Sequence, residues 1–139
     1  MFERILAAID QSDAAGRVIA AAREMAELSH GEVWVLHLRE REVMGRGGGM
    51  YSAESHADAG TLVDTATGKL AAAGVTAHSV VRDTLFGHAA GEIVDEARAH
   101  DAGVIVMGSR GHGDLAGLVV GSTAHKVIHL SDRPVLVVR

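Results

Sequence analysis

Candidate ligand-binding residues lie mainly in the C-terminal part of the chain. An apolar run at 104–107 stops at a glycine, and glycine then recurs at short intervals. These glycines are Gly108, Gly111, Gly113, Gly117 and Gly121. Ser122 and Thr123 follow, at the predicted start of a helix. Free N–H groups and the positive end of the helix dipole attract anions at such a start. The pattern predicts a phosphate-binding site built mainly from backbone and hydroxyl groups.

The two common phosphate-binding motifs do not match these glycines. The sequence GxxxxGK[ST] is absent, and residues 108–113 run in the reverse order of the dinucleotide fingerprint. The same residues also fit a tight turn and a loop without a ligand. Arg110 and His112 lie inside this loop, where they either reach a triphosphate or remain in solvent. Ser122 and Thr123 can cap the helix and bind phosphate together, because both roles use the same geometry.

Asp10 follows a second apolar run, at 4–9, that predicts a buried strand. An aspartate in this place is more often a turn residue or cap than a ligand contact. Ser12 is a candidate N-cap for the next helix, with Asp13 in its first turn.

A metal site built from histidines is not favoured, although the chain has nine of them. His125 and His129 share one helix face, but no H-E-x-x-H motif accompanies them. A solvent-exposed pair is the better interpretation. If a triphosphate binds, Mg²⁺ or Mn²⁺ could accompany it, held mainly by phosphate oxygens and water.

The composition limits the classes of function. The 139 residues fit one domain, 1–139, and the absence of cysteine fits a reducing, cytoplasmic compartment. The net charge of −5, without a cluster of lysine and arginine, argues against nucleic acid as a partner. The N-terminal segment lacks the length and flanks of a signal peptide or membrane span, so no membrane association is expected.

The order of predicted elements gives an α/β fold. Apolar runs predict five strands, at 4–9, 32–38, 75–82, 103–108 and 133–138. Helical periodicity separates them, at about 13–30, 62–74, 90–97 and 122–130. Such alternation implies right-handed crossovers and a doubly wound parallel sheet with helices on both faces.

Residues 39–60 are expected to form a mobile loop. The segment is polar and glycine-rich at 39–55, and it shows no hydrophobic period. Within it, 45–52 is either a lid over a ligand or plain disorder, and disorder is the favoured interpretation.

These residues resemble the universal stress protein family. The spacing Gly108-x2-Gly111-x9-Gly121-Ser122 matches the ATP-binding signature of that family. "RILAAIDQS" and "VWVLHL" resemble its first two strands, and "GSTAHKVIHLSDRPVLVV" resembles its last helix and strand. Ala8, Ala89 and Gly103 depart from residues common in relatives, but none of them removes an expected ligand contact.

The resemblance implies a five-stranded parallel sheet of order 3-2-1-4-5, similar to the adenine nucleotide α-hydrolase-like and Rossmann-like folds. Asp10 would then face Gly108 where the strand order reverses. ATP, or else AMP or cyclic AMP, would bind there. The implied ATP-binding residues are Asp10, Leu38, Met107, Gly108, Ser109, Arg110, Gly111, Gly121, Ser122 and Thr123. Asp10 would contact the nucleoside end, the backbone of Leu38 would meet the adenine, and the glycines with Ser122 and Thr123 would hold ribose and phosphates.

The resemblance also implies a homodimer through the last strand, 134–138, an edge strand that needs covering. The favoured function is a nucleotide-binding regulator in a stress response. No general base, Walker lysine or arginine finger is evident, so no catalytic residue is assigned and any ATPase should be slow. Two alternatives stay open: a hydrolase or nucleotidyl transferase using AMP or ATP, and a dimerisation module without a nucleotide.

Overall fold

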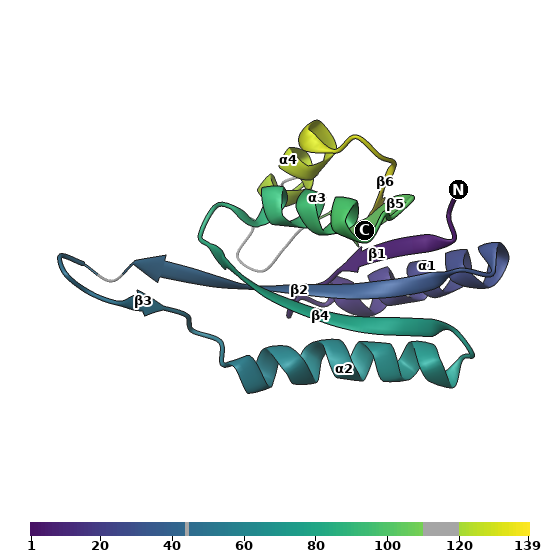
Figure 1. The fold of residues 1–139 in the computed structure, drawn as a ribbon, viewed down its shortest axis with the longest axis horizontal. Coiled ribbons are helices and arrows are strands. Elements are labelled where there is room, and N and C mark those ends of the chain that lie inside the picture. The colour runs from purple at the N-terminus through teal and green to yellow at the C-terminus, as the bar shows by residue number, and fades with distance from the viewer. Residues whose placement is uncertain (44, 110–119) are drawn as a thin grey trace.

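The chain folds into one central sheet with helices packed on both of its faces (Figure 1). The computed structural model describes residues 1–43, 45–109 and 120–139. Its strands are β1 (Arg4–Ala8), β2 (Glu32–Val43), β3 (Met50–Tyr51), β4 (Thr76–Leu85), β5 (Val104–Gly108) and β6 (Val135–Val138). Its helices are α1 (Ala14–Ser29), α2 (His56–Ala72), α3 (Ala89–Ala99) and α4 (Ser122–Leu130).

The parallel part of the sheet has the order β4-β2-β1-β5-β6. In the numbering of the predicted strands this is the expected order 3-2-1-4-5. The sheet has a sixth strand, however, because β3 pairs antiparallel with the end of β2. The prediction of a purely parallel, five-stranded sheet is therefore wrong in the number of strands. The added strand is only two residues long and exposed, so it leaves no hydrophobic pattern in the sequence.

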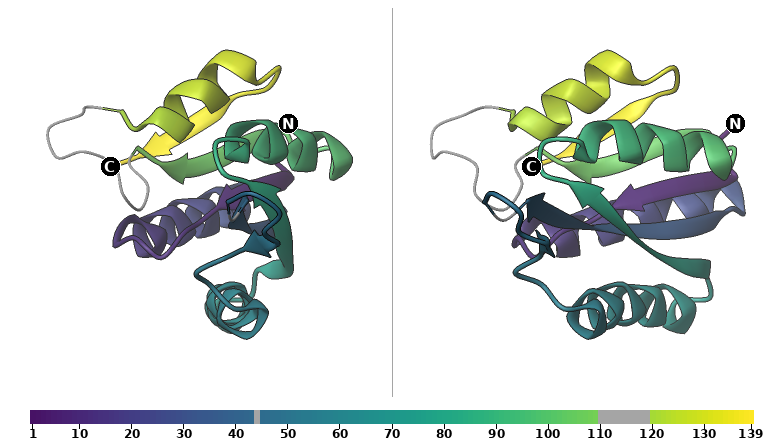
Figure 2. Two further views of the ribbon diagram at one scale, coloured as in Figure 1. Left: turned by 90° about the vertical axis from the view of Figure 1, so that its left-hand side faces the viewer. Right: turned by 60° about the vertical axis from the view of Figure 1, so that its left-hand side comes forward.

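Two apolar cores lie on opposite faces of the sheet. Successive side chains of a strand point to opposite faces, so Ile5 and Ala7 pack with α1 and α2, whereas Leu6 packs with α3 and α4. All three side chains are fully buried. Figure 2 shows the two helix pairs on either side of the sheet. Among the described residues, no helix is long and apolar enough to cross a membrane.

The segment 39–60 is more regular than a loop. The strand β2 continues to Val43 and pairs with β4 as far as Arg41 and Leu85. At the other end, α2 already begins at His56, where the hydroxyl of Ser55 accepts a hydrogen bond from the N–H of Asp58 at 3.0 Å. The prediction of a loop over 39–60 is thus wrong for both ends. β2 is extended because its backbone pairs with β4. The sequence of this part shows no apolar period that would indicate the pairing. The mobility of this segment stays a prediction.

The β2–β3 hairpin projects beyond the body of the molecule (Figure 1). It carries the exposed side chains of Val43, Met50 and Tyr51. After β3 the chain leads to α2, and residues 52–54 of this connection border the cavity described below.

Candidate functional site

A cavity of about 730 Å³ opens at the carboxyl ends of β1, β2 and β5. In the sheet, β2 lies on one side of β1 and β5 lies on its other side. The connection after β1 leads to β2, and the chain reaches β5 only later. Helices therefore diverge from this edge and leave a crevice, which is the usual ligand position in an open α/β sheet. The volume lies within the range of small-molecule and cofactor sites.

Most of the predicted site residues that the structure describes border this cavity. They are Asp10, Leu38, Met107, Gly108, Ser122 and Thr123. They come from four separate parts of the chain, and the topology of the sheet brings them together. Arg110 and Gly111 lie outside the described residues.

Ser109 and Gly121 are placed differently from the expectation. Ser109 is buried, and its N–H donates to the carbonyl of Val138 at 2.8 Å. The N–H of Gly121 donates to the carbonyl of Ser109. This N–H is therefore engaged within the protein, and a contact of either residue with a ligand stays a prediction. The two residues fasten the start of α4 to the end of β5, beneath the groups that border the cavity.

The N-terminus of α4 supplies the positive end of the site. Gly121 is the N-cap, and no side chain caps the helix. The first N–H groups of an α-helix have no carbonyl partner one turn before them, so those of Ser122 and Thr123 point out of the helix end. Lys126 stands one turn further along and also borders the cavity. Backbone dipoles, two hydroxyl groups and one ammonium group thus converge on one end of the cavity.

Asp10 occupies the opposite wall and shapes the β1–α1 connection. Its carboxylate accepts a hydrogen bond from the N–H of Ser12 at 2.8 Å, which makes a tight turn at the end of the strand. The turn role and a place at the cavity therefore coexist. Ser12 is not the helix cap that the sequence predicted. The N-cap is Asp13, which makes no side-chain capping bond, and Ser12 belongs to the turn that Asp10 closes.

An ion pair that sequence reasoning missed closes one side of the cavity. His37 is almost fully buried, and its Nδ1 lies 2.9 Å from the carbonyl oxygen of Ile9. Its Nε2 lies 2.8 Å from Oε2 of Glu54. The other carboxylate oxygen of Glu54, Oε1, accepts a hydrogen bond from the side-chain amide of Gln11 at 3.1 Å. An oxygen atom therefore faces each ring nitrogen of His37. The pair holds the segment after β3 against β1 and β2.

Glu40 adds a perturbed carboxyl group to the same cavity. Burial, together with the nearby carboxylates of Glu42 and Asp10, raises the pKa of Glu40 above its ordinary value. With Asp10, Glu54 and Asp58, it gives the cavity wall four carboxyl groups. Within the described ranges, no three acidic or histidine side chains are arranged to hold a metal ion.

We expect Glu40→Gln to raise the free energy of unfolding at neutral and mildly alkaline pH. A raised pKa means that the folded chain binds the Glu40 proton more tightly than the unfolded chain does. The resulting stabilisation is complete below the pKa of the unfolded chain and is lost as pH rises through the pKa of the folded chain. The gain should be on the order of a few tenths of a kcal/mol, because water screens an exposed side chain.

Urea unfolding at several pH values checks this expectation. The advantage of Glu40→Gln should shrink on acidification and reach zero where both proteins carry a neutral side chain. The matched control is Glu24→Gln, an exposed carboxyl on α1 away from the cavity. An advantage of the Glu40 variant that stays constant from acidic to neutral pH would contradict the argument.

The whole chain, residues 1–139, matches the family model of the universal stress protein family. The chain belongs to the universal stress protein family. A curated relative, universal stress protein YxiE of Bacillus subtilis (strain 168), is 32% identical and is covered in full, as is this chain.

Solved universal stress proteins share this fold. A structure from Archaeoglobus fulgidus is 27% identical with a TM-score of 0.77, covering 100% of this chain and 99% of that one. A structure from Archaeoglobus fulgidus in complex with dAMP is 26% identical with a TM-score of 0.73, covering 100% and 98%. A universal stress protein in complex with cAMP is 22% identical with a TM-score of 0.70, covering 99% and 97%, a likeness that shows the fold alone.

Proposed function

We propose that this universal stress protein binds an adenine nucleotide, with ATP as the first candidate, in the cavity at the ends of β1, β2 and β5. The observation that carries the proposal is the N-terminus of α4, which presents free N–H groups, Ser122 and Thr123 to a cavity of about 730 Å³. The Archaeoglobus fulgidus relative solved with dAMP supports the same class of ligand. The glycine spacing from Gly108 to Gly121, which resembles the ATP-binding signature of the family, supports ATP as the first candidate.

The phosphates would lie at the start of α4 and next to Gly108, where a side chain would block close approach. Lys126 would add a positive charge there. The ribose would lie near Asp10, and the adenine would meet the backbone of Leu38, with Met107 forming one wall of the cavity. Arg110 and Gly111 belong to the proposed site through the resemblance alone.

Charge balance favours a divalent cation with the triphosphate. Four carboxyl groups border the cavity, whereas Lys126 is the only lysine or arginine among the described residues that line it. A polyanion beside such a wall gains from Mg²⁺ or Mn²⁺, which phosphate oxygens and water would hold. The cation would neutralise phosphate charge, and no residue of this chain is assigned to it as a ligand.

The nucleotide would act as a regulatory ligand. Ligand occupancy would change the populations of conformations or the contacts with partners. The ion pair of His37 with Glu54 makes residues 52–54 a candidate for this response, because it joins them to the cavity wall. A cytoplasmic site of action is part of the proposal.

A second copy of the chain is the proposed protein partner. Among the described residues, β6 pairs only with β5 and forms an edge of the sheet. Its four residues are all apolar, and the Leu136 side chain is 39% exposed. An apolar edge without a charge or proline among these four residues favours pairing with another strand. A two-fold dimer through β6 would cover it.

Release and rebinding of ligands test the nucleotide proposal. Mass spectrometry of the freshly purified and denatured protein should detect an adenine nucleotide. Thermal unfolding should shift upward with Mg-ATP, by about 2.7 kcal/mol of added stability at 100 times the Kd. If ATP, AMP and cyclic AMP all leave the unfolding unchanged, the proposal fails. Rapid formation of ADP or AMP during the incubation would instead support an enzyme.

A further inference from the structure

Phe86 stands out because it is both strongly exposed and part of the cavity wall. It lies at the turn from β4 into α3, and 66% of it remains accessible to solvent. The chain contains only two phenylalanines, one tyrosine and one tryptophan. Among the described residues, Phe86 is the only aromatic residue, apart from His37, that borders the cavity. The burial of a ring of this size is worth a few kcal/mol, so its exposure at a cavity calls for an explanation.

Hydrogen bonds of the backbone fix the position of the main chain at Phe86. Leu85 is the strand partner of Arg41, and the N–H of Phe86 donates to the carbonyl of Arg41 at 3.0 Å. The following turn is closed by the N–H of His88, which donates to the carbonyl of Leu85 at 2.9 Å, and it uses Gly87 at a φ of 85°. Phe86 is therefore held at the exit of β4, next to the exit of β2.

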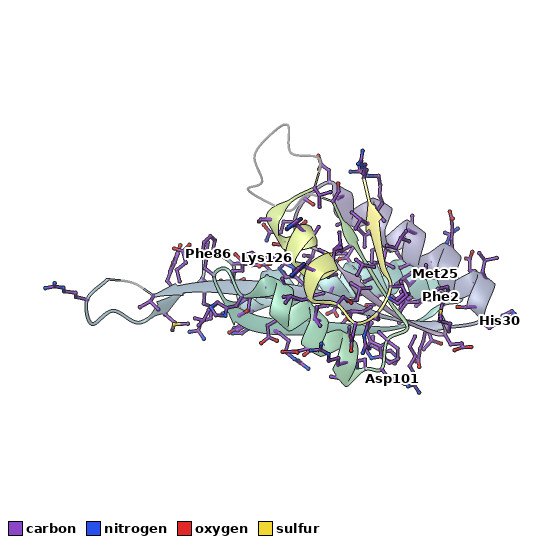
Figure 3. All side chains as sticks on the ribbon, turned by 90° about the horizontal axis from the view of Figure 1, so that it is seen from above. Phe2, Met25, His30, Phe86, Asp101 and Lys126 are labelled. Atoms are coloured by element: carbon purple, nitrogen blue, oxygen red, sulfur yellow. The ribbon has the colours of Figure 1, made fainter. Side chains whose placement is uncertain are left out.

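The exit of β4, where Phe86 lies, is separated across the sheet from the exit of β5, which leads toward α4. The strands β5, β1, β2 and β4 are neighbours in that order, and α4 follows β5. Three inter-strand spacings separate β5 from β4, which is roughly 14 Å. In Figure 3, Phe86 is labelled on the side of the projecting hairpin, and Lys126 is labelled on α4. The cavity joins the two residues.

A nucleotide fits this separation. It carries its phosphates at one end and a flat, largely apolar base at the other. With the phosphates at the start of α4, the base points along the cavity toward β2 and β4. Leu38 on β2 and Phe86 just beyond the end of β4 both border the cavity there, and Phe86 follows Arg82, the strand partner of Leu38, by four residues.

We propose that Phe86 stacks on the base of the bound nucleotide and is a determinant of its affinity. This inference rests on the proposed function and goes beyond it by naming the side chain that holds the base. Every nucleobase has a π-face, so stacking rewards the presence of a base and tolerates its identity. A bound base would also cover the exposed ring, which explains an apolar side chain at this position.

Equilibrium dialysis with labelled ATP tests the proposal on full-length variants. Phe86→Ala should weaken ATP binding about tenfold, the size expected for one base–aromatic stack. Phe86→Tyr keeps the ring and should bind within about twofold of the unchanged protein. Phe86→Leu keeps apolar bulk without a π-face and should resemble the alanine variant more than the tyrosine variant. The matched control is Leu85→Ala, an adjacent exposed residue that does not border the cavity.

A second readout separates contact from indirect effects. Stacking on Phe86 should shift the NMR signals of the base protons H2 and H8 upfield in the complex, and the Phe86→Leu complex should lack that shift at saturation. ATP binding by Phe86→Ala equal to that of the unchanged protein would overturn the inference alone. Equal losses in the leucine and tyrosine variants would overturn it as well. Absence of ATP binding by the unchanged protein would overturn the proposed function, and the inference would fall with it.

Discussion

The double variant Gly121→Val, Ser122→Val should bind ATP at least about a hundredfold more weakly than the unchanged protein. Two branched side chains would stand at the start of α4, where the phosphates are proposed to approach the backbone. The variant also loses the Ser122 hydroxyl. Hydrogen bonds to a charged group are worth about 1.5–3 kcal/mol each, so the loss of one or two accounts for this factor.

The backbone conformation at Gly121 allows valine, and the folding of the double variant is measured separately. Gly121 has φ −66° and ψ 163°, a conformation open to every L-residue, so valine adds no backbone strain there. The N–H of Gly121, which donates to Ser109, is kept in the variant. Isothermal titration with Mg-ATP measures the affinity, and thermal unfolding without nucleotide measures the fold.

A matched control for the double variant is Gly68→Val. Gly68 is exposed on α2, away from the cavity, and a Cβ there would meet no heavy atom within 4 Å. This variant should bind ATP as the unchanged protein does. A double variant that unfolds at the same temperature and retains full affinity for ATP would show that the start of α4 does not hold the phosphates.

Leu136→Arg should convert the proposed dimer into a monomer. In a two-fold interface through β6, each substituted residue meets the equivalent edge of the partner, so two guanidinium groups would be brought together. The change also removes apolar area from the interface and places charge on an edge strand, which is a common way to prevent pairing. Sedimentation equilibrium of both proteins at equal concentration measures the effect.

Leu28→Arg is the control for the dimer experiment. Leu28 is 86% exposed near the end of α1. The substitution introduces the same charge as Leu136→Arg, but away from β6. This variant should keep the mass of the unchanged protein. If the unchanged protein is itself monomeric, the dimer proposal fails. If Leu136→Arg remains a dimer, the interface lies elsewhere.

The sequence alone determined much of the architecture and the positive end of the site. Apolar runs such as 104–107 predicted the central strands, because a strand buried on both faces must be apolar throughout. Ser122 and Thr123 were predicted at a helix start, and the structure puts them at the start of α4 beside the cavity, while their contact with a ligand stays a prediction. Both inferences rest on local patterns: the burial of a strand and the chemistry of a helix terminus. The order of the parallel strands came from the resemblance to the family.

The tertiary structure decided the rest of the cavity. The ion pair of His37 with Glu54 joins residues that are 17 positions apart, across a segment that the sequence predicted as a loop. Phe86 reaches the cavity because β4 runs beside the extended β2, a pairing of polar residues without an apolar period. The N–H of Gly121 is bound to Ser109, not presented to a ligand. Hydrophobic periodicity reports which side chains are buried, whereas contacts between distant segments depend on strand pairing and turns, which leave no periodic trace in the sequence.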